Sequence, residues 1–138
     1  MSNKILDPTT GALNTSLNLR LMNQNVISSN IANADTPGYK SKAMEFEGAL
    51  REALNVDGRL PMEGSHPEHI VHRETDAVHP EIYDDPNGVE SLDGNTVDRA
   101  AEMAKMAENQ ILYNSGVEMM RKKLGMLKYA ITEGGGNH

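Results

Sequence analysis

The last third of the chain carries the strongest hydrophobic pattern. Starting at Met103, alternating steps of three and four residues reach nine positions, and eight of them are apolar. Such a seam, sustained over about four heptads, predicts one long helix with coiled-coil packing over residues 97–132. At 1.5 Å per residue this helix would be roughly 54 Å long. The seam consists of Met103, Met106, Gln110, Tyr113, Val117, Met120, Leu124, Leu127 and Ile131.

A second apolar stripe near the N-terminus predicts a helix from about residue 9 to residue 33. Leu13, Leu17 and Leu21 follow one another at i+4 spacing, and Ile27 and Ile31 continue the stripe. Asparagines crowd the other faces, and their side chains compete for backbone hydrogen bonds. We therefore expect this helix to need partners in order to persist.

The middle of the chain shows weaker patterns. Phe46, Leu50 and Leu54 predict one short amphipathic helix. The chain then becomes polar, acidic and rich in proline, which favours loops. Short extended pieces are expected at residues 69–72 and 81–83, where a small β-hairpin could form.

These patterns predict a mostly α fold without a deep globular core. The economical arrangement packs the two long terminal helices against each other as an antiparallel pair with coiled-coil packing, joined by the loop-rich middle. We expect three parts: an N-terminal axial helix and elbow over residues 1–40, an acidic, Pro-rich loop region over residues 41–94, and a long C-terminal axial helix over residues 95–138. The longer helix keeps part of its seam uncovered, which predicts self-association or a partner helix.

A sharp turn is predicted directly after the first helix, at the sequence Thr-Pro-Gly-Tyr. Pro37 disfavours helical backbone at Thr36 and extends the chain. Pro-Gly at the centre of a turn suits type II geometry, in which Gly38 takes a positive φ. The chain therefore leaves the helix at a fixed angle. The residues expected to set this elbow are Asn30, Asn33, Thr36, Pro37, Gly38 and Tyr39.

The start of the C-terminal helix also carries turn and capping signals. Asp93 and Gly94 predict a turn, and Asn95 or Thr96 is expected to cap the helix. Asp98 would then lie in the first turn, where the helix dipole favours an anion.

Composition adds that the chain, at 138 residues, holds at most one domain. The net charge is −7, and the stretch from Asp57 to Asp93 contains ten acidic and two basic residues, so the rest of the chain carries +1. This distribution argues against a nucleic-acid partner. No run of about 20 apolar residues is present, so we do not expect membrane insertion, and the N-terminus does not resemble a secretory signal peptide.

Candidate chemistry is sparse. His66, His69 and His72, with His79 nearby, invite a zinc hypothesis, but Pro67 opposes the helix that would bring such ligands together. No nucleophile elbow, P-loop or dinucleotide fingerprint occurs. We therefore expect no catalytic residues, no cofactor and no metal, and hence no enzyme. A small metal-dependent enzyme and a free regulatory coiled-coil module are the rival hypotheses.

Two motifs carry a family resemblance. Residues 30–40, Asn-Ile-Ala-Asn-Ala-Asp-Thr-Pro-Gly-Tyr-Lys, resemble the N-terminal signature shared by rod, hook and hook-associated proteins of the bacterial flagellum. Residues 91–98, Ser-Leu-Asp-Gly-Asn-Thr-Val-Asp, together with residues 102–110, resemble the C-terminal element of FlgB-type proximal rod proteins. The related FlgC type usually departs from the direct Thr-Pro-Gly-Tyr arrangement that this chain keeps.

The resemblance implies a structural subunit of the proximal rod of the flagellar basal body. Its terminal helices would pack into a hollow helical drive shaft that transmits torque and lets exported subunits pass. Implied partners are copies of itself, other rod subunits, the ring adaptor or export gate at the rod base, and the flagellar type III export apparatus. Export would occur without a cleaved signal peptide. The assembled rod would lie in the periplasmic space. The alternatives are a FlgC-type rod protein and a free cytosolic coiled-coil module.

Under this hypothesis the two apolar stripes hold each subunit to its neighbours. The residues assigned to subunit packing are Leu13, Leu17, Leu21, Ile27, Ile31, Met103, Met106, Tyr113, Val117, Met120, Leu124, Leu127 and Ile131.

Overall fold

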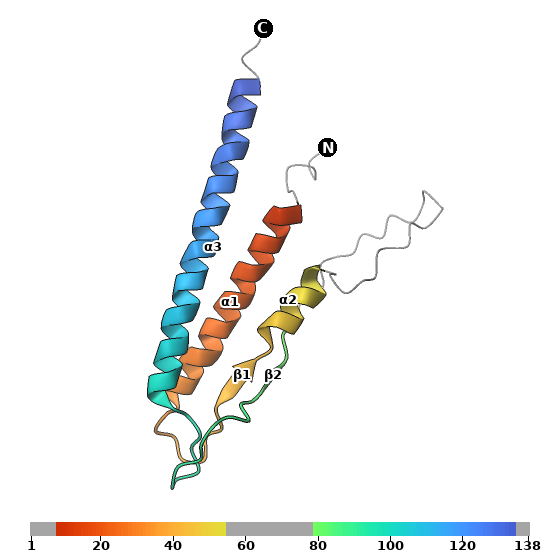
Figure 1. Cartoon of the computed structure of the whole chain (residues 1–138). Coiled ribbons are helices and arrows are strands. Elements are labelled where there is room, and N and C mark those ends of the chain that lie inside the picture. The colour runs from red at the N-terminus through yellow and green to blue at the C-terminus, as the bar shows by residue number, and fades with distance from the viewer. Residues whose placement is uncertain (1–7, 55–78, 135–138) are drawn as a thin grey trace, which may run out of the picture.

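A computed structural model describes residues 8–54 and 79–134 of the chain. Figure 1 shows two long helices side by side, with a short helix and a small sheet on one flank. The elements are α1 (Pro8–Ala32), β1 (Lys42–Met44), α2 (Phe46–Leu54), β2 (Ile82–Asp84) and α3 (Arg99–Gly134).

The two long helices form the antiparallel pair that the apolar stripes predict. Helix α1 has 25 residues and α3 has 36, and both lie within two residues of the predicted bounds. The C-terminal turns of α3 extend past the first turn of α1, so this end of α3 has no helix beside it (Figure 1). Within the described residues, no helix is long and apolar enough to cross a membrane.

The middle of the chain contributes α2 and one strand on each side of residues 55–78. Helix α2 confirms the prediction from Phe46, Leu50 and Leu54. Strands β1 and β2 pair antiparallel, with Ala43 opposite Tyr83. The strand near residues 81–83 is therefore confirmed within one residue, but it pairs with the segment that follows the elbow and forms no local hairpin. The other expected strand, residues 69–72, lies outside the described residues.

The apolar core is small and lies on the side of α1 that faces β1 and α2. Its buried members are Leu19, Val26, Met44 and Ala49, with Phe46 and Leu50 packed against them. Leu19 and Val26 lie beside the predicted stripe of α1, because α1 is covered on two sides, by α3 and by α2. The fold is therefore a thin layer of helices.

Close approach of α1 and α3 depends on Gly116. A Cβ atom added there would lie 2.8 Å from Cδ2 of Leu17, which is closer than carbon atoms normally approach. Leu17 therefore packs over a position that has no side chain. At Gly125, nearer the free end of α3, an added Cβ would meet no atom within 4 Å.

We expect Gly116→Leu to lower the free energy of unfolding by about 1–3 kcal/mol, because overpacking pushes the helices apart. Gly125→Leu is the matched control, and leucine's better helix propensity should leave stability unchanged or slightly raised. Urea unfolding followed by circular dichroism at 222 nm measures both. Equal stabilities of the two variants would contradict the placement of Leu17 over Gly116.

Candidate functional site: the elbow clasp and the exposed face of α3

The elbow that follows α1 adopts the predicted turn. Gly38 has a φ of 72°, as the third position of a type II turn requires. The Tyr39 amide donates to the carbonyl oxygen of Thr36 (3.2 Å), and the Gly38 amide donates to that of Asp93 (2.9 Å). Gly94 also has a positive φ, of 79°. Two sharp turns, one before β1 and one before α3, are thus joined through their backbones.

Asn95, which lies just before α3, closes the C-terminal end of α1. Its side-chain amide nitrogen lies 2.9 Å, 3.0 Å and 2.8 Å from the carbonyl oxygens of Asn33, Ala34 and Thr36. Its two N–H donors thus serve three acceptors just beyond α1. The carbonyl oxygens of Asn33 and Thr36 also accept from the backbone amides of Thr36 and Tyr39, whereas Ala34 receives its hydrogen bond from Asn95. Asn95 is 3% exposed, so water does not replace these bonds.

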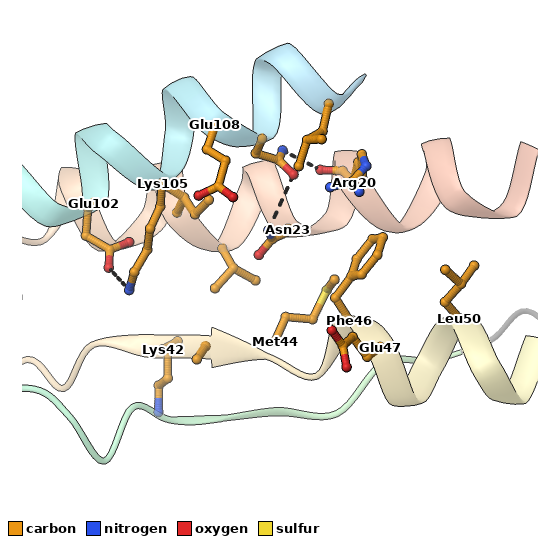
Figure 2. A pocket seen from close by; sticks show the side chains of 15 residues that line it. Arg20, Asn23, Lys42, Met44, Phe46, Glu47, Leu50, Glu102, Lys105 and Glu108 are labelled. Carbon is orange, nitrogen blue, oxygen red and sulfur yellow. Dashed lines mark hydrogen bonds and ion pairs between the residues drawn. The ribbon is translucent and has the colours of Figure 1, made fainter. Parts of the chain in front are cut away.

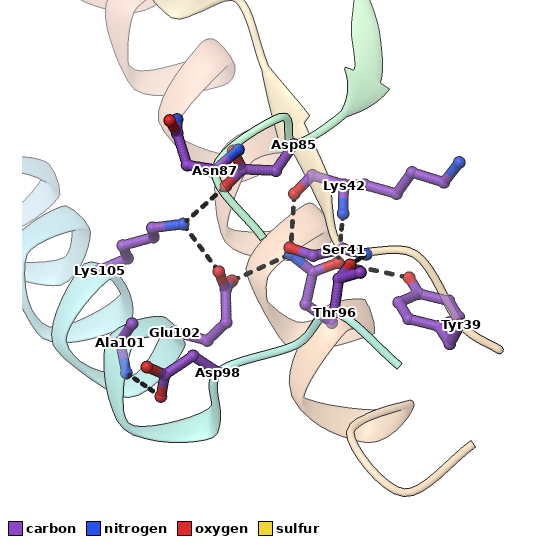
Figure 3. Close-up of polar contacts among 11 residues, drawn as sticks. Tyr39, Ser41, Lys42, Asp85, Asn87, Thr96, Asp98, Ala101, Glu102 and Lys105 are labelled. Atoms are coloured by element: carbon purple, nitrogen blue, oxygen red, sulfur yellow. Dashed lines mark hydrogen bonds and ion pairs between the residues drawn. The ribbon is translucent and has the colours of Figure 1, made fainter. Parts of the chain in front are cut away.

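The prediction that Asn95 or Thr96 caps α3 is therefore wrong. The Asn95 side-chain oxygen accepts from the amide of Val97, before the helix begins. Thr96 Oγ1 accepts from the amide of Ser41 at the start of the β1 segment (2.8 Å). The N-cap of α3 is Asp98, whose carboxylate accepts from the amide of Ala101 (3.1 Å) (Figure 3).

Asn30 joins α1, β1 and α3 and has no exposed surface. Its side-chain oxygen accepts from the Lys42 amide (2.9 Å) and from the Tyr39 hydroxyl (3.3 Å). Its side-chain nitrogen donates to the Lys42 carbonyl oxygen (2.8 Å) and to a carboxylate oxygen of Glu102 (2.9 Å). The carboxamide thereby pairs with β1 as a neighbouring strand would, and it holds α3 at the same time.

Glu102 is a buried carboxylate (2% exposed) whose charge is compensated. Besides Asn30 it accepts from Lys105 Nζ at 2.8 Å, and Lys105 lies 3.5 Å from Asp85 (Figure 3). Burial lowers the pKa of Lys105, but the hydrogen bond to Glu102 and the two nearby carboxylates outweigh it, so the pKa is raised overall. The amide of Asn87 and the charge of Lys105 lower the pKa of Asp85. We call Asn30, Gly38, Asn95 and Glu102 the elbow clasp.

A second buried polar contact lies about two turns along the helix pair from the clasp. Asn109 is 4% exposed, and its side-chain nitrogen donates to the backbone carbonyl of Arg20 and to Gln24 Oε1, both at 2.9 Å. Asn23 donates to Asn109 at 3.4 Å. Polar residues buried between paired helices fix their register, because any slip leaves their groups unsatisfied.

The row of α3 that meets α1 most closely is therefore Glu102, Asn109 and Gly116, spaced seven residues apart. The apolar seam predicted from sequence flanks this row. Because none of the three residues is apolar, a search for hydrophobic periodicity passes over them. The signal available in the sequence was the spacing of these three residues, which recur every seven positions beside the seam.

The residues assigned to subunit packing divide into two groups. Ile27 is buried within the chain. The half-buried residues are Leu13, Leu17, Ile31, Met106, Tyr113, Val117, Met120 and Leu127. The exposed residues are Leu21, Met103, Leu124 and Ile131. Further exposed apolar residues of α3 were not assigned to subunit packing from the sequence, namely Ile111, Leu112, Met119, Met126 and Tyr129.

A groove of about 600 Å³ lies between α3 and the β1–α2 segment, with α1 as its floor (Figure 2). Arg20 stacks over the Phe46 ring at 4.6 Å, and Lys105 is paired with Glu102. Within residues 8–54 and 79–134, no group of three histidine, cysteine or acidic side chains is placed to hold a metal ion. His66, His69 and His72 lie outside these residues.

Comparisons with known proteins agree on one family. The family model described as "Flagella basal body rod protein" matches residues 11–40, which hold most of α1 and the elbow. The "Flagellar basal body rod protein FlgB" of Aeromonas hydrophila is 36% identical over 113 residues, 81% of this chain and 84% of that protein. The FlgB proteins of Salmonella typhimurium and Bacillus subtilis are each 35% identical, over 86% and 80% of this chain and 88% and 83% of their own lengths.

We expect Gly38→Val to abolish swimming, because a β-branched residue at a φ of 72° costs about 1–3 kcal/mol and misdirects the chain after α1. Gly38→Asn is the matched control, since asparagine tolerates this region and no atom crowds the position. Soft-agar motility of strains that carry only the variant measures both. Normal swimming with valine would contradict a role for the turn.

We expect Asn95→Ala to lower the free energy of unfolding by about 1–3 kcal/mol, because the Ala34 carbonyl group loses its donor and those of Asn33 and Thr36 each lose one of two donors. Asn25→Ala, at an exposed asparagine of α1, should have little effect or stabilise slightly. Urea denaturation of the two purified variants makes the comparison. If they were equally stable, Asn95 would not hold the end of α1.

Proposed function

The chain belongs to the FlgB-type flagellar basal body rod proteins, and from this membership we propose that its terminal helices pack into the wall of a hollow helical shaft. The protein is a structural subunit of the proximal rod. In the proposed shaft, α1 and α3 run along the axis, transmit torque, and leave a lumen through which exported subunits pass.

The apolar face that α3 leaves uncovered is the observation that carries this proposal. Exposed fractions are 66% for Ile111, 67% for Met126 and 65% for Tyr129, and these residues share one side of the helix. Leu124 and Ile131 add exposed apolar surface to the end of α3 that extends past α1. Apolar surface on this scale marks an interaction site, and helices of neighbouring subunits would cover it.

Several residues of the predicted seam are only half-buried, which supports a role in packing both within the subunit and between subunits. Met106, Tyr113 and Val117 are half-covered within one subunit, and their remaining surface would meet a neighbour. Methionine side chains adapt to irregular surfaces, which suits contacts with rod subunits of different sequence. The proposed partners are copies of this chain, other rod subunits, and the ring adaptor or export gate at the rod base.

Export is proposed to use the flagellar type III apparatus without a cleaved signal peptide and to deliver the subunit to the periplasmic space. The thin core and the buried polar contacts between α1 and α3 support late folding, because a single subunit gains little from burying its helices alone. Neighbouring subunits would supply the remaining burial. A FlgC-type protein is not favoured, since the matching relatives are named FlgB, and a free coiled-coil module would not require the elbow.

We expect basal bodies purified from the source bacterium, stripped of hook and filament, to contain this chain by mass spectrometry. Leu124→Asp should be exported but missing from the rods, because the new carboxylate would be buried without a partner at the subunit contact. Asn18→Asp places the same charge at an exposed polar position of α1 and should be incorporated. Finding the Leu124 variant in intact rods would refute the assignment of that contact, and finding the native chain only in the cytosol would refute the proposed function.

A further inference from the structure

The small sheet has one closed edge and one open edge. On the closed edge, both backbone groups of Lys42 in β1 are paired with the side chain of Asn30. Strand β1 lies between α1 and β2, so the other edge belongs to β2 and faces away from the helices (Figure 1). The exposed side chains of all three β2 residues agree with this position.

The register determines which groups the open edge presents. The Glu45 amide donates to the Glu81 carbonyl (3.0 Å), and the Asp85 amide donates to the Ser41 carbonyl (2.8 Å). Residues 81, 83 and 85 therefore face β1, and in an antiparallel ladder the intervening Ile82 and Asp84 direct their N–H and C=O groups outward. No hydrogen bond in the described part of the chain reaches these four groups.

A mainly apolar hollow adjoins this edge, between the sheet and the outer side of α1. Its volume is about 360 Å³. Ile82 lies opposite Met44 in the register, on the sheet face that meets α1, and it remains 55% exposed. The hollow is lined by Met22, Asn25, Val26, Ser29, Lys42 and Ile82.

We propose that the edge of β2 accepts an extended segment of a neighbouring rod subunit as a third strand. The segment would pair its backbone with Ile82 and Asp84 and place one apolar side chain in the hollow beside Ile82. The exposed carboxylate of Glu81 favours a segment without acidic residues, whereas the carboxylates of Asp84 and Asp85 are already paired with Lys42 and Lys105. When a strand adds to a sheet edge, backbone hydrogen bonds provide affinity and side-chain pockets provide specificity. The open edge of β2 and the hollow beside it would supply one of each.

Two features of the β2 edge disfavour nonspecific strand pairing in the free subunit. Strand β2 has only three residues, and Asp84 forms an ion pair with Lys42. Short, charged edges resist nonspecific pairing. A third strand would thus add stably only where other contacts hold the donor in place, as the proposed packing of neighbouring subunits in the rod does. The identification of the added segment as part of a neighbouring rod subunit therefore rests on the proposed function. The observation that the edge of β2 is open does not depend on it.

Ile82→Pro tests the pairing, since proline removes an N–H that points outward and is tolerated at such edge positions. We expect this variant to keep the native circular dichroism and melting temperature but to be reduced at least tenfold in purified basal bodies. Ile82→Val keeps the edge and should be incorporated normally. Tyr83→Pro removes an N–H on the β1 side and should lower the melting temperature, which shows what damage to the fold looks like.

A photo-crosslinking amino acid at position 82 of the otherwise native chain identifies the occupant without depending on the proline variant. Crosslinks in purified basal bodies should join position 82 to an extended segment of another subunit, and the same residue at exposed position 92 should not yield that product. Crosslinks only within the same chain, or equal incorporation of the proline and valine variants, would overturn the inference. If the native chain itself were absent from basal bodies, the proposed function would fail instead.

Discussion

The carbonyl groups at the end of α1 are the constraint on which the fold depends. A helix end leaves such groups unpaired, and burying them without donors costs free energy. Here the donor to the Ala34 carbonyl group is the carboxamide of Asn95, 61 residues away in the chain. Asn30 imposes the same condition from inside α1, since its amide is satisfied only when β1 and Glu102 are both in place. The end of α1 and the start of α3 therefore form together.

This coupling compensates for a small core. The five buried apolar residues in the described part of the chain cannot by themselves offset the conformational entropy of two long helices. The polar contacts at Asn30, Glu102 and Asn109 add little net stability, but they fix where the helices pair. The consequence is a subunit whose geometry is set at the elbow and whose remaining apolar surface is left for neighbours. A rod subunit needs that division, because its contacts must be strong in the assembly and the geometry of its elbow must be the same in every copy.

Hydrophobic periodicity predicted the helices well, and the conformational preferences of proline and glycine predicted the elbow turn. The stripes through Leu13 and Met103 placed α1 and α3, and the Pro-Gly pair identified the positive φ at Gly38. Strand β1 was missed because three residues, Lys-Ala-Met, carry no alternating signal of their own and become a strand by pairing with Asn30 and β2. Asn95 was assigned to the wrong helix, since a capping side chain reads identically in sequence whichever backbone it bonds. The buried Glu102 row could not be found by counting apolar residues.

Native-state hydrogen exchange of the purified chain tests the central claim most directly, namely that the elbow clasp makes the two long helices open as one unit. Amide exchange rates are measured along α1 and α3 at increasing urea concentrations below the unfolding transition. The clasp account predicts that the last turns of α1 and the first turns of α3 share one opening free energy and one urea dependence. Separate opening free energies for the two helix ends, with α1 exchanging while the start of α3 stays protected, would contradict it.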